Sequence, residues 1–125
     1  MLDVGAGTGF LSILAARCGA KMVYACEPTK IADHARQIIA KTDDGKHVET
    51  IKIVKKRIED CVLDVDIPRV DIIISEWMGF CLLFEGMLDS VIYARENFLV
   101  KDGLMFPERA KLYLAAADDL DEKVK

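Results

Sequence analysis

The chain has 125 residues, of which 52% are hydrophobic and 30% are charged, a composition typical of one soluble globular domain. Its formal net charge of -4 argues against a nucleic-acid-binding surface, so we expect no direct contact with nucleic acid. No apolar run reaches the roughly 18 residues of a membrane span, and the first residues do not read as a secretory signal. We therefore expect a protein of the cytoplasm or the nucleus, with no membrane partner.

The cysteines and histidines indicate neither a metal site nor a disulfide framework. No pair of cysteines has Cys-x-x-Cys spacing, and His34 and His47 have no neighbours of the kind that bind metals. The sequence thus predicts no metal ion and favours a reducing compartment. The four cysteines are Cys18, Cys26, Cys61 and Cys81.

Apolar runs alternate with amphipathic stretches along the whole chain. Short β-branched runs predict strands, and apolar residues at helical spacing predict helices. The last predicted helix is followed by a turn at 101–103. In chain order the predicted elements are a strand at 1–4, a helix from 10 to 18, a strand at 22–26, a helix over 30–41, strands at 50–54 and 70–74, a helix from about 84 to 97, and a strand over 111–116.

The same spacing predicts the buried faces of the helices. We expect each face to pack against a sheet, because an amphipathic helix buries its apolar stripe. The predicted inner residues are Phe10, Leu11, Leu14, Ala15 and Cys18 in the first helix, Ile31, Ala35, Ile38 and Ile39 in the second, and Phe84, Met87, Leu88, Val91, Ile92 and Phe98 in the third.

Strands that alternate with helices predict a parallel sheet with right-handed crossovers. The expected fold class is α/β, a Rossmann-like three-layer sandwich with a mostly parallel sheet, in one domain over 1–125. A first strand of four residues is short for a central strand. We therefore expect that further residues precede it.

The loop at 5–9 points to a nucleoside ligand. Gly5, Gly7 and Gly9 allow a sharp turn from strand to helix and a close approach of the backbone to a bound molecule. A dinucleotide fingerprint would need a sixth-position glycine, so a pyrophosphate ligand is disfavoured. Asp3, just before the loop, suits a cationic amino group, and Glu27 follows the next strand, where a carboxylate can accept hydrogen bonds from ribose hydroxyls.

Two carboxylates follow the strand predicted at 70–74. Glu76 lies where that strand ends, and Glu85 lies nine residues later, beyond a glycine-containing loop. Ligands of open α/β sheets bind outside the carboxyl ends of the strands, so we expect both side chains beside the crevice. Adjacent carboxylates repel each other unless a cation lies between them, and a planar guanidinium pairs with carboxylates in a forked geometry. The pair therefore suits an arginine side chain.

These motifs resemble the protein arginine methyltransferases, which have a class I S-adenosylmethionine-dependent methyltransferase core. The segment LDVGAGTG at 2–9 is similar to the first motif of that core, and SEWMG at 75–79 with EGML at 85–88 resembles the double-glutamate loop of the arginine enzymes. Similar phrases are VDIII at 70–74, YAR at 93–95 and DGLMFP at 102–107, so the resemblance covers essentially the whole chain.

The resemblance implies S-adenosyl-L-methionine as the cofactor and assigns residues to it. Asp3, Gly5 and Gly7 would line its amino acid moiety, and Glu27 would hold its ribose. Ile58 and Glu59 would flank the adenine, although this chain carries two extra residues just before them; an ordinary solvated glutamate is the less favoured alternative for Glu59.

The resemblance also implies the substrate and the reaction. Glu76 and Glu85 would clamp the arginine of a protein substrate, such as an Arg-Gly-rich segment or a histone tail, in an enzyme of the asymmetrically dimethylating type. Met78 and Met87 would crowd the target nitrogen in the substrate pocket or serve as flexible core filler. Trp77 would form a wall for the arginine stem or anchor the loop.

The family's N-terminal lid helices and C-terminal β-barrel with its dimerisation arm have no counterpart in the 125 residues. We expect the chain to be the cofactor-binding part of a longer, homodimeric enzyme, with little or no activity by itself. Two alternatives stay open. One is a non-catalytic regulatory partner of an arginine methyltransferase, and the other is a methyltransferase that acts on another substrate.

Overall fold

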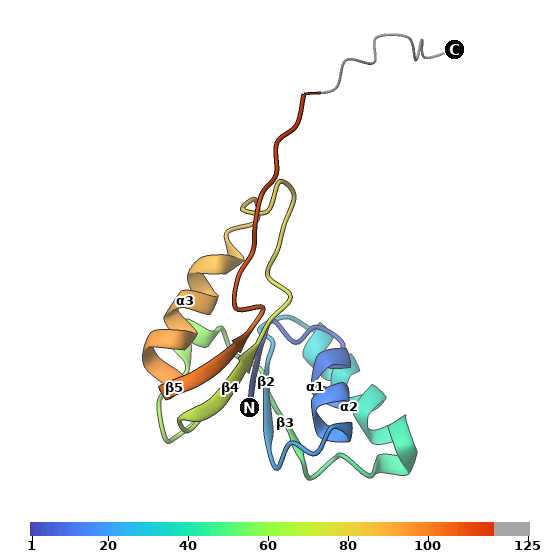
Figure 1. The fold of residues 1–125 in the computed structure, drawn as a ribbon. Coiled ribbons are helices and arrows are strands. Elements are labelled where there is room, and N and C mark those ends of the chain that lie inside the picture. Colours follow the sequence, from blue (N-terminus) through green and yellow to red (C-terminus); the bar gives the residue numbers. More distant parts are fainter. Residues whose placement is uncertain (117–125) are drawn as a thin grey trace, which may run out of the picture.

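Five strands form one sheet, and every neighbouring pair is parallel; the order is β3 (Ile51–Val54), β2 (Val23–Cys26), β1 (Leu2–Val4), β4 (Val70–Ile74) and β5 (Leu99–Phe106). The computed structural model describes residues 1–116 (Figure 1). Chain order reverses between β1 and β4, which creates the switch point where open α/β sheets bind ligands. The elements are β1 Leu2–Val4, α1 Phe10–Arg17, β2 Val23–Cys26, α2 Ile31–Lys41, β3 Ile51–Val54, β4 Val70–Ile74, α3 Met87–Phe98 and β5 Leu99–Phe106, with 3-10 turns at Thr42–Gly45 and Ile58–Asp60.

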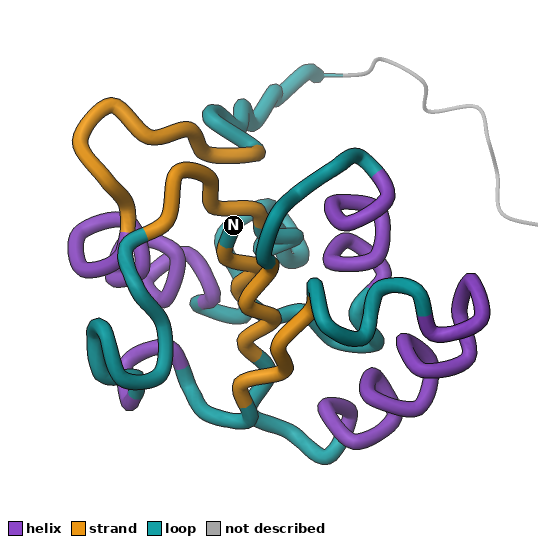
Figure 2. Tube along the Cα trace, turned by 90° about the horizontal axis from the view of Figure 1, so that it is seen from below, coloured by secondary structure: helices purple, strands orange, loops and turns teal. Residues whose placement is uncertain are grey.

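The sheet is the middle layer of three. Helices α1 and α2 cover one face and α3 covers the other, as the views along and across the strands show (Figures 1 and 2). Side chains alternate between the faces, so Leu2 and Val4 pack in the core beneath α3 while Asp3 points to the side of α1. The predicted α/β three-layer fold with a parallel sheet is therefore confirmed.

The predictions for the first four strands are confirmed, but the last strand was placed wrongly. We expected a turn at 101–103 and a strand over 111–116, whereas β5 spans Leu99–Phe106 and residues 111–116 form no strand. The residues expected to form a turn lie inside β5 instead. The pairing of β5 with β4 has a register shift, and Asp102 has a φ of 64°. Turn chemistry can produce a bulge inside a strand as well as a connection between strands.

The predicted inner faces of the helices are only partly correct. In α1 the buried residues are Ser12, Ile13, Ala15 and Ala16, whereas Phe10 is 65% exposed and Leu14 and Cys18 are exposed. Small side chains let this helix lie close to the sheet, so its larger apolar residues point elsewhere. In α2, Ala35 and Ile39 are buried as predicted, but Ile31 and Ile38 are exposed.

Helix α3 begins later than predicted. Its first residue is Met87, and Phe84, which we expected on its inner face, is 71% exposed in the preceding loop. The left-handed Gly86 precedes the first turn and separates the loop from the helix. Within 1–116 no helix has the length and apolar character needed to cross a membrane, and the four cysteines are free thiols.

The end of the sheet where the strands begin is held by an ionic cluster. Arg17 donates two hydrogen bonds to Asp43, from Nε at 2.7 Å and from Nη2 at 2.8 Å. The ring of the buried His47 lies 3.1 Å from the same carboxylate. The cluster ties α1 to the 3-10 turn that precedes β3, at the edge opposite the glycine loop.

Candidate functional site

The glycine loop lies at the carboxyl edge of the sheet and is fixed by its neighbours. The amides of Gly5 and Ala6 both donate to the carbonyl of Cys26, at 2.9 and 3.0 Å, which joins the loop to the end of β2. Gly5 has a φ of 74°, and a Cβ placed there would lie 2.0 Å from the Met87 Cε. The left-handed backbone conformation favours glycine at this position, and a side chain there would also require the flexible end of Met87 to move.

Glu27 closes the loop from the side of β2. Its carboxylate is buried and accepts hydrogen bonds from the amide of Gly7 at 3.0 Å and from the amide of Thr29 at 2.9 Å. Each carboxylate oxygen has more than one acceptor position, so both oxygens can still accept from a diol. Glu27 thus shapes the glycine loop and presents acceptors where the sequence predicted a ribose site.

Asp3 lies beneath the same loop. Its carboxyl is 1% exposed, and Oδ2 accepts a 2.6 Å hydrogen bond from the hydroxyl of Ser12 in α1. The other oxygen, Oδ1, is buried and has no hydrogen-bond partner within residues 1–116. Burial raises the pKa of Asp3 to about 6, against the lowering effect of the Ser12 hydrogen bonds and with a smaller raising effect from the charge of Glu27.

Glu59 is held by residues of α3 and of its own turn. Ser90 Oγ donates to its Oε1 at 2.5 Å, and Arg57 Nε lies 3.4 Å from its Oε2. Burial alone would raise the pKa of the Glu59 carboxyl, but the hydrogen bond from Ser90 and the charge of Arg57 outweigh burial and keep the pKa below its usual value. The side chain is therefore an oriented, ionised acceptor rather than a freely solvated glutamate.

These groups surround one cleft of about 250 Å³. That volume is slightly below the usual range for small-molecule pockets and suits a nucleoside-sized part of a ligand. Four of the six predicted cofactor residues line it, while Asp3 lies beneath the glycine loop and Gly7 hydrogen-bonds Glu27. The lining residues are Val4, Gly5, Cys26, Glu27, Pro28, Arg57, Ile58, Glu59, Met87 and Ser90.

Met87 and Ser90 in this lining were not predicted there. We expected Met87 in the substrate pocket; its methyl group packs on Gly5 in this cleft, and its contact with a substrate stays a prediction. Ser90 was missed because a lone serine carries no pattern by itself. Its spacing of three residues from Met87 places both on one helical face, and that spacing was the available signal.

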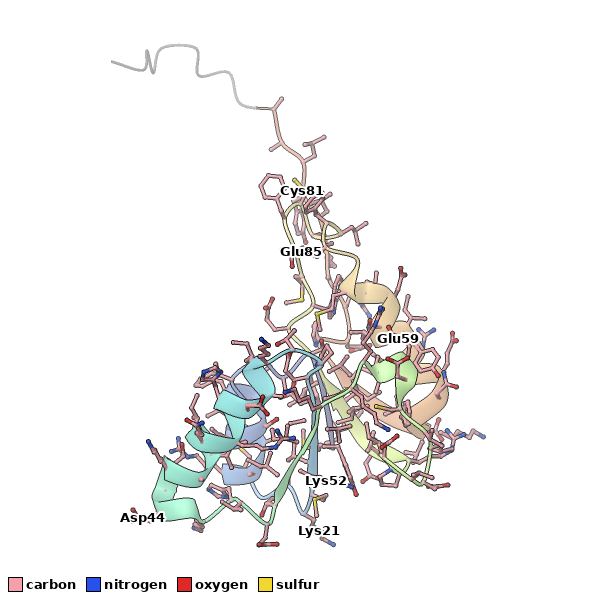
Figure 3. All side chains as sticks on the ribbon, turned by 180° about the vertical axis from the view of Figure 1, so that it is seen from behind. Lys21, Asp44, Lys52, Glu59, Cys81 and Glu85 are labelled. Atoms are coloured by element: carbon pink, nitrogen blue, oxygen red, sulfur yellow. The ribbon has the colours of Figure 1, made fainter. Side chains whose placement is uncertain are left out.

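The predicted catalytic loop projects beyond the sheet. Trp77 is buried in the core and anchors the loop, whereas Met78, Glu76 and Glu85 are exposed. Figure 3 shows Cys81 at the far end of the loop and Glu85 on its returning arm. Neither glutamate accepts a hydrogen bond or forms an ion pair within the described part of the chain. Their pairing around a guanidinium stays a prediction.

The loop is closed on itself at Gly79. The amides and carbonyls of Gly79 and Leu82 exchange hydrogen bonds of 3.0 and 2.9 Å. A Cβ at Gly79 would lie 2.5 Å from the carbonyl oxygen of Phe84 and 3.2 Å from Cγ of Glu85. Glycine at 79 is thus what allows the arm carrying Glu85 to pass close to the outgoing arm.

The comparisons with known proteins agree on one family, although no protein-family model matches the chain. Protein arginine N-methyltransferase 8-B of Danio rerio is 48% identical over 124 residues, which are 98% of this chain and 28% of the relative. Protein arginine N-methyltransferase 1 of Oryza sativa subsp. indica is 46% identical over 123 residues, which are 98% of this chain and 30% of the relative. The chain therefore spans less than a third of the length of these curated relatives.

A solved structure supports the same relationship. The Trypanosoma brucei PRMT1 enzyme-prozyme heterotetrameric complex with AdoHcy matches with a TM-score of 0.77 and 44% identity, over 86% of this chain and 32% of that one. The relatives that match in sequence and the solved structure that matches in fold are all arginine methyltransferases, and the chain belongs to the protein arginine N-methyltransferase family.

Proposed function

We propose that the protein containing this chain transfers a methyl group from S-adenosyl-L-methionine to a guanidino nitrogen of arginine in proteins, and that this chain forms its cofactor-binding core. The observation that carries the proposal is the cleft at the switch point, which brings Gly5, Glu27 and Glu59 together from three separate segments. The relative from Trypanosoma brucei was solved with AdoHcy, the demethylated form of that cofactor.

The residues of the cleft, together with Asp3 beneath the glycine loop, fit such a cofactor. The unpartnered, buried Oδ1 of Asp3 suits the cationic amino group, and the oxygens of Glu27 suit the ribose hydroxyls. Glu59, oriented by Ser90, suits the exocyclic amine of the adenine beside Ile58. When bound, S-adenosyl-L-methionine supplies an activated methyl group on a sulfonium. The chain's own contribution is to bind, to orient and to exclude water.

We assign the catalytic step to the projecting loop. A guanidinium is a weak nucleophile because its lone pairs are delocalised over three nitrogens. Glu76 and Glu85 would hold it between two negative charges, concentrate electron density on the reacting nitrogen, and accept the proton that leaves it. Because most of the loop is exposed, with Trp77 buried in the core and Leu82 packed against it, we expect segments of the intact protein outside this chain to complete the pocket.

The alternative of a non-catalytic partner is favoured by one observation. The matched Trypanosoma brucei complex contains a prozyme beside its enzyme, so an arginine methyltransferase can assemble with a second kind of chain. We favour the catalytic role, because a chain without activity gains nothing from a buried carboxyl with an unpartnered oxygen. We further propose a homodimer of the cytoplasm or nucleus that acts on Arg-Gly-rich segments or histone tails.

Methyl transfer to an Arg-Gly-rich peptide tests the proposal. The intact protein is incubated with labelled S-adenosyl-L-methionine and the peptide, alone and with an active homologue. We expect label in the peptide from the protein alone, and a loss of about 10²- to 10³-fold in kcat for Glu76→Gln and for Glu85→Gln, because each removes charge stabilisation in the transition state. Glu96→Gln, on the exposed face of α3, is the matched control and should retain activity.

Each of the other outcomes contradicts one part of the proposed function. Label that requires the added homologue identifies a regulatory partner. Near-normal rates in both loop variants reject the clamp, and label in small molecules alone rejects the arginine substrate.

A further inference from the structure

The hydrogen bond between Ser12 and Asp3 joins the first turns of α1 to the end of β1 beneath the glycine loop. Ser12 is fully buried, and its hydroxyl donates to Oδ2 of Asp3 at 2.6 Å. Both partners are thus shielded from water, where a hydrogen bond to a carboxylate is strong. Neither composition nor helical spacing predicted a polar contact on the face of α1 that packs against the sheet.

The other groups around Asp3 do not stabilise its ionised form, so the contact with Ser12 matters. The strand neighbours of Asp3 are Ala25 in β2 and Ile74 in β4, which carry no charge. The charged group that acts on it is Glu27, at the end of β2, and its negative charge disfavours an ionised Asp3. Ser12 therefore supplies the favourable interaction that opposes burial and the charge of Glu27.

We propose that Ser12 is a positioning residue for cofactor binding, whose hydroxyl holds Oδ2 of Asp3 and leaves the buried Oδ1 to accept a hydrogen bond from a cationic amino group. The inference rests on the proposed function, since it takes the cofactor's amino acid moiety as the source of that group. It goes further by giving α1 a part in recognition. It also makes the affinity depend on pH, because only the ionised carboxylate attracts an ammonium.

The direction of that dependence follows from the protonation of Asp3. As the pH falls through about 6, Asp3 gains a proton and the site loses the charge that attracts the ammonium. Without the Ser12 hydroxyl the ionised form is less stable, so the same change should occur at a higher pH. A hydrogen bond to a charged group is strong enough to move this midpoint by about one pH unit or more.

Calorimetric titration of the intact protein with S-adenosylhomocysteine between pH 5 and pH 7.5 tests the proposal. Over this range the ligand's own amino group, whose pKa is about 7.7 or higher, stays more than half protonated, and comparing the variants with the natural protein at each pH cancels its partial titration. We expect the affinity of the natural protein to fall below pH 6 and that of Ser12→Ala to fall below about pH 7. For a shift of one unit the two affinities would differ about tenfold at pH 5 and only about twofold at pH 7.

Three further variants separate a tuned charge from a general packing defect. Ser12→Cys keeps the volume with a weaker donor and should have an intermediate midpoint. Ser75→Ala is the matched control, because Ser75 is also a buried serine but donates to the carbonyl of Val4, at 2.8 Å. It should leave the midpoint unchanged. Asp3→Asn should remove the pH dependence near 6 altogether.

The outcomes distinguish this proposal from the one it rests on. If the natural protein binds no S-adenosylhomocysteine at any pH, the proposed function fails. If it binds but Ser12→Ala weakens affinity by the same factor at every pH, Ser12 is merely structural and this inference is wrong. Should Ser12→Ala not fold, the carbon-13 shift of the Asp3 carboxyl in Ser12→Cys decides, since an unchanged midpoint there also overturns it.

Discussion

The carboxyl of Asp3 is 1% exposed, and burial in the folded state raises its pKa from 3.8 to about 6. A group whose pKa is higher in the folded state contributes stability that is fully present below its unfolded pKa and is lost as the pH rises through its folded value. Asp3→Asn removes this loss. We expect its free energy of unfolding at pH 7 to exceed that of the natural protein by about 1–3 kcal/mol, while cofactor affinity falls.

Urea denaturation at pH 4 and at pH 7 checks this expectation for the two proteins. The difference between them should widen from pH 4 to pH 7, because the other carboxyls titrate alike in both. A difference of the same size at both pH values would show that ionisation of Asp3 does not lower the free energy of unfolding.

At the scale of elements, the first residue of α3 packs on the glycine loop. Gly5→Ala would force a left-handed φ of 74° on alanine and bring its Cβ within 2.0 Å of the Met87 Cε, whereas Gly7→Ala meets only the dihedral strain, because nothing lies within 4 Å. Strain alone is about 1–2 kcal/mol. Because Met87 Cε is the far end of a flexible side chain, thermal and urea unfolding should show Gly5→Ala to be modestly the more destabilising, and adding Met87→Ala should remove the excess. Equal losses at the two glycines would contradict this packing.

The sequence predicted those features of the fold and the site that depend on a single physical requirement. Strands such as Val70–Ile74 are rich in β-branched residues, so their places were predictable. The carboxyl-edge rule placed Glu27 beside the cleft, and the family resemblance placed Glu59 there. The buried face of α1 was not predictable, because that helix has two apolar faces and spacing does not say which one the sheet covers. Ser12 and Ser90 were also missed, because a serine hydroxyl can hydrogen-bond to many kinds of group. Which group it contacts is seen only in the folded structure.

At the scale of the whole molecule, helices α1 and α2 cover only part of their face of the sheet. A hollow of about 720 Å³ runs between α1 and β4, and apolar side chains such as Leu11, Leu14 and Ile72 line it. Exposed apolar surface of this extent promotes association. We expect the chain 1–125, made by itself, to self-associate, and Leu14→Lys to reduce that association.

Ile38→Lys is the matched control for this prediction. Ile38 lies on α2 outside the hollow and is 39% exposed, against 38% for Leu14. Light scattering at increasing concentration should show a lower mass for Leu14→Lys than for Ile38→Lys. Similar masses for the two variants would mean that the hollow has no special part in association.

Because all five strands run in one direction, they all begin at one rim of the sheet and end at the other, where the cleft lies. Figure 3 shows Lys21, Asp44 and Lys52 at one rim and Glu85 and Cys81 beyond the other. The rim of Lys21 and Asp44 can therefore change in sequence, lengthen or accept an affinity tag without disturbing the cleft at the opposite rim. We expect sequence change there to have little effect on the proposed activity.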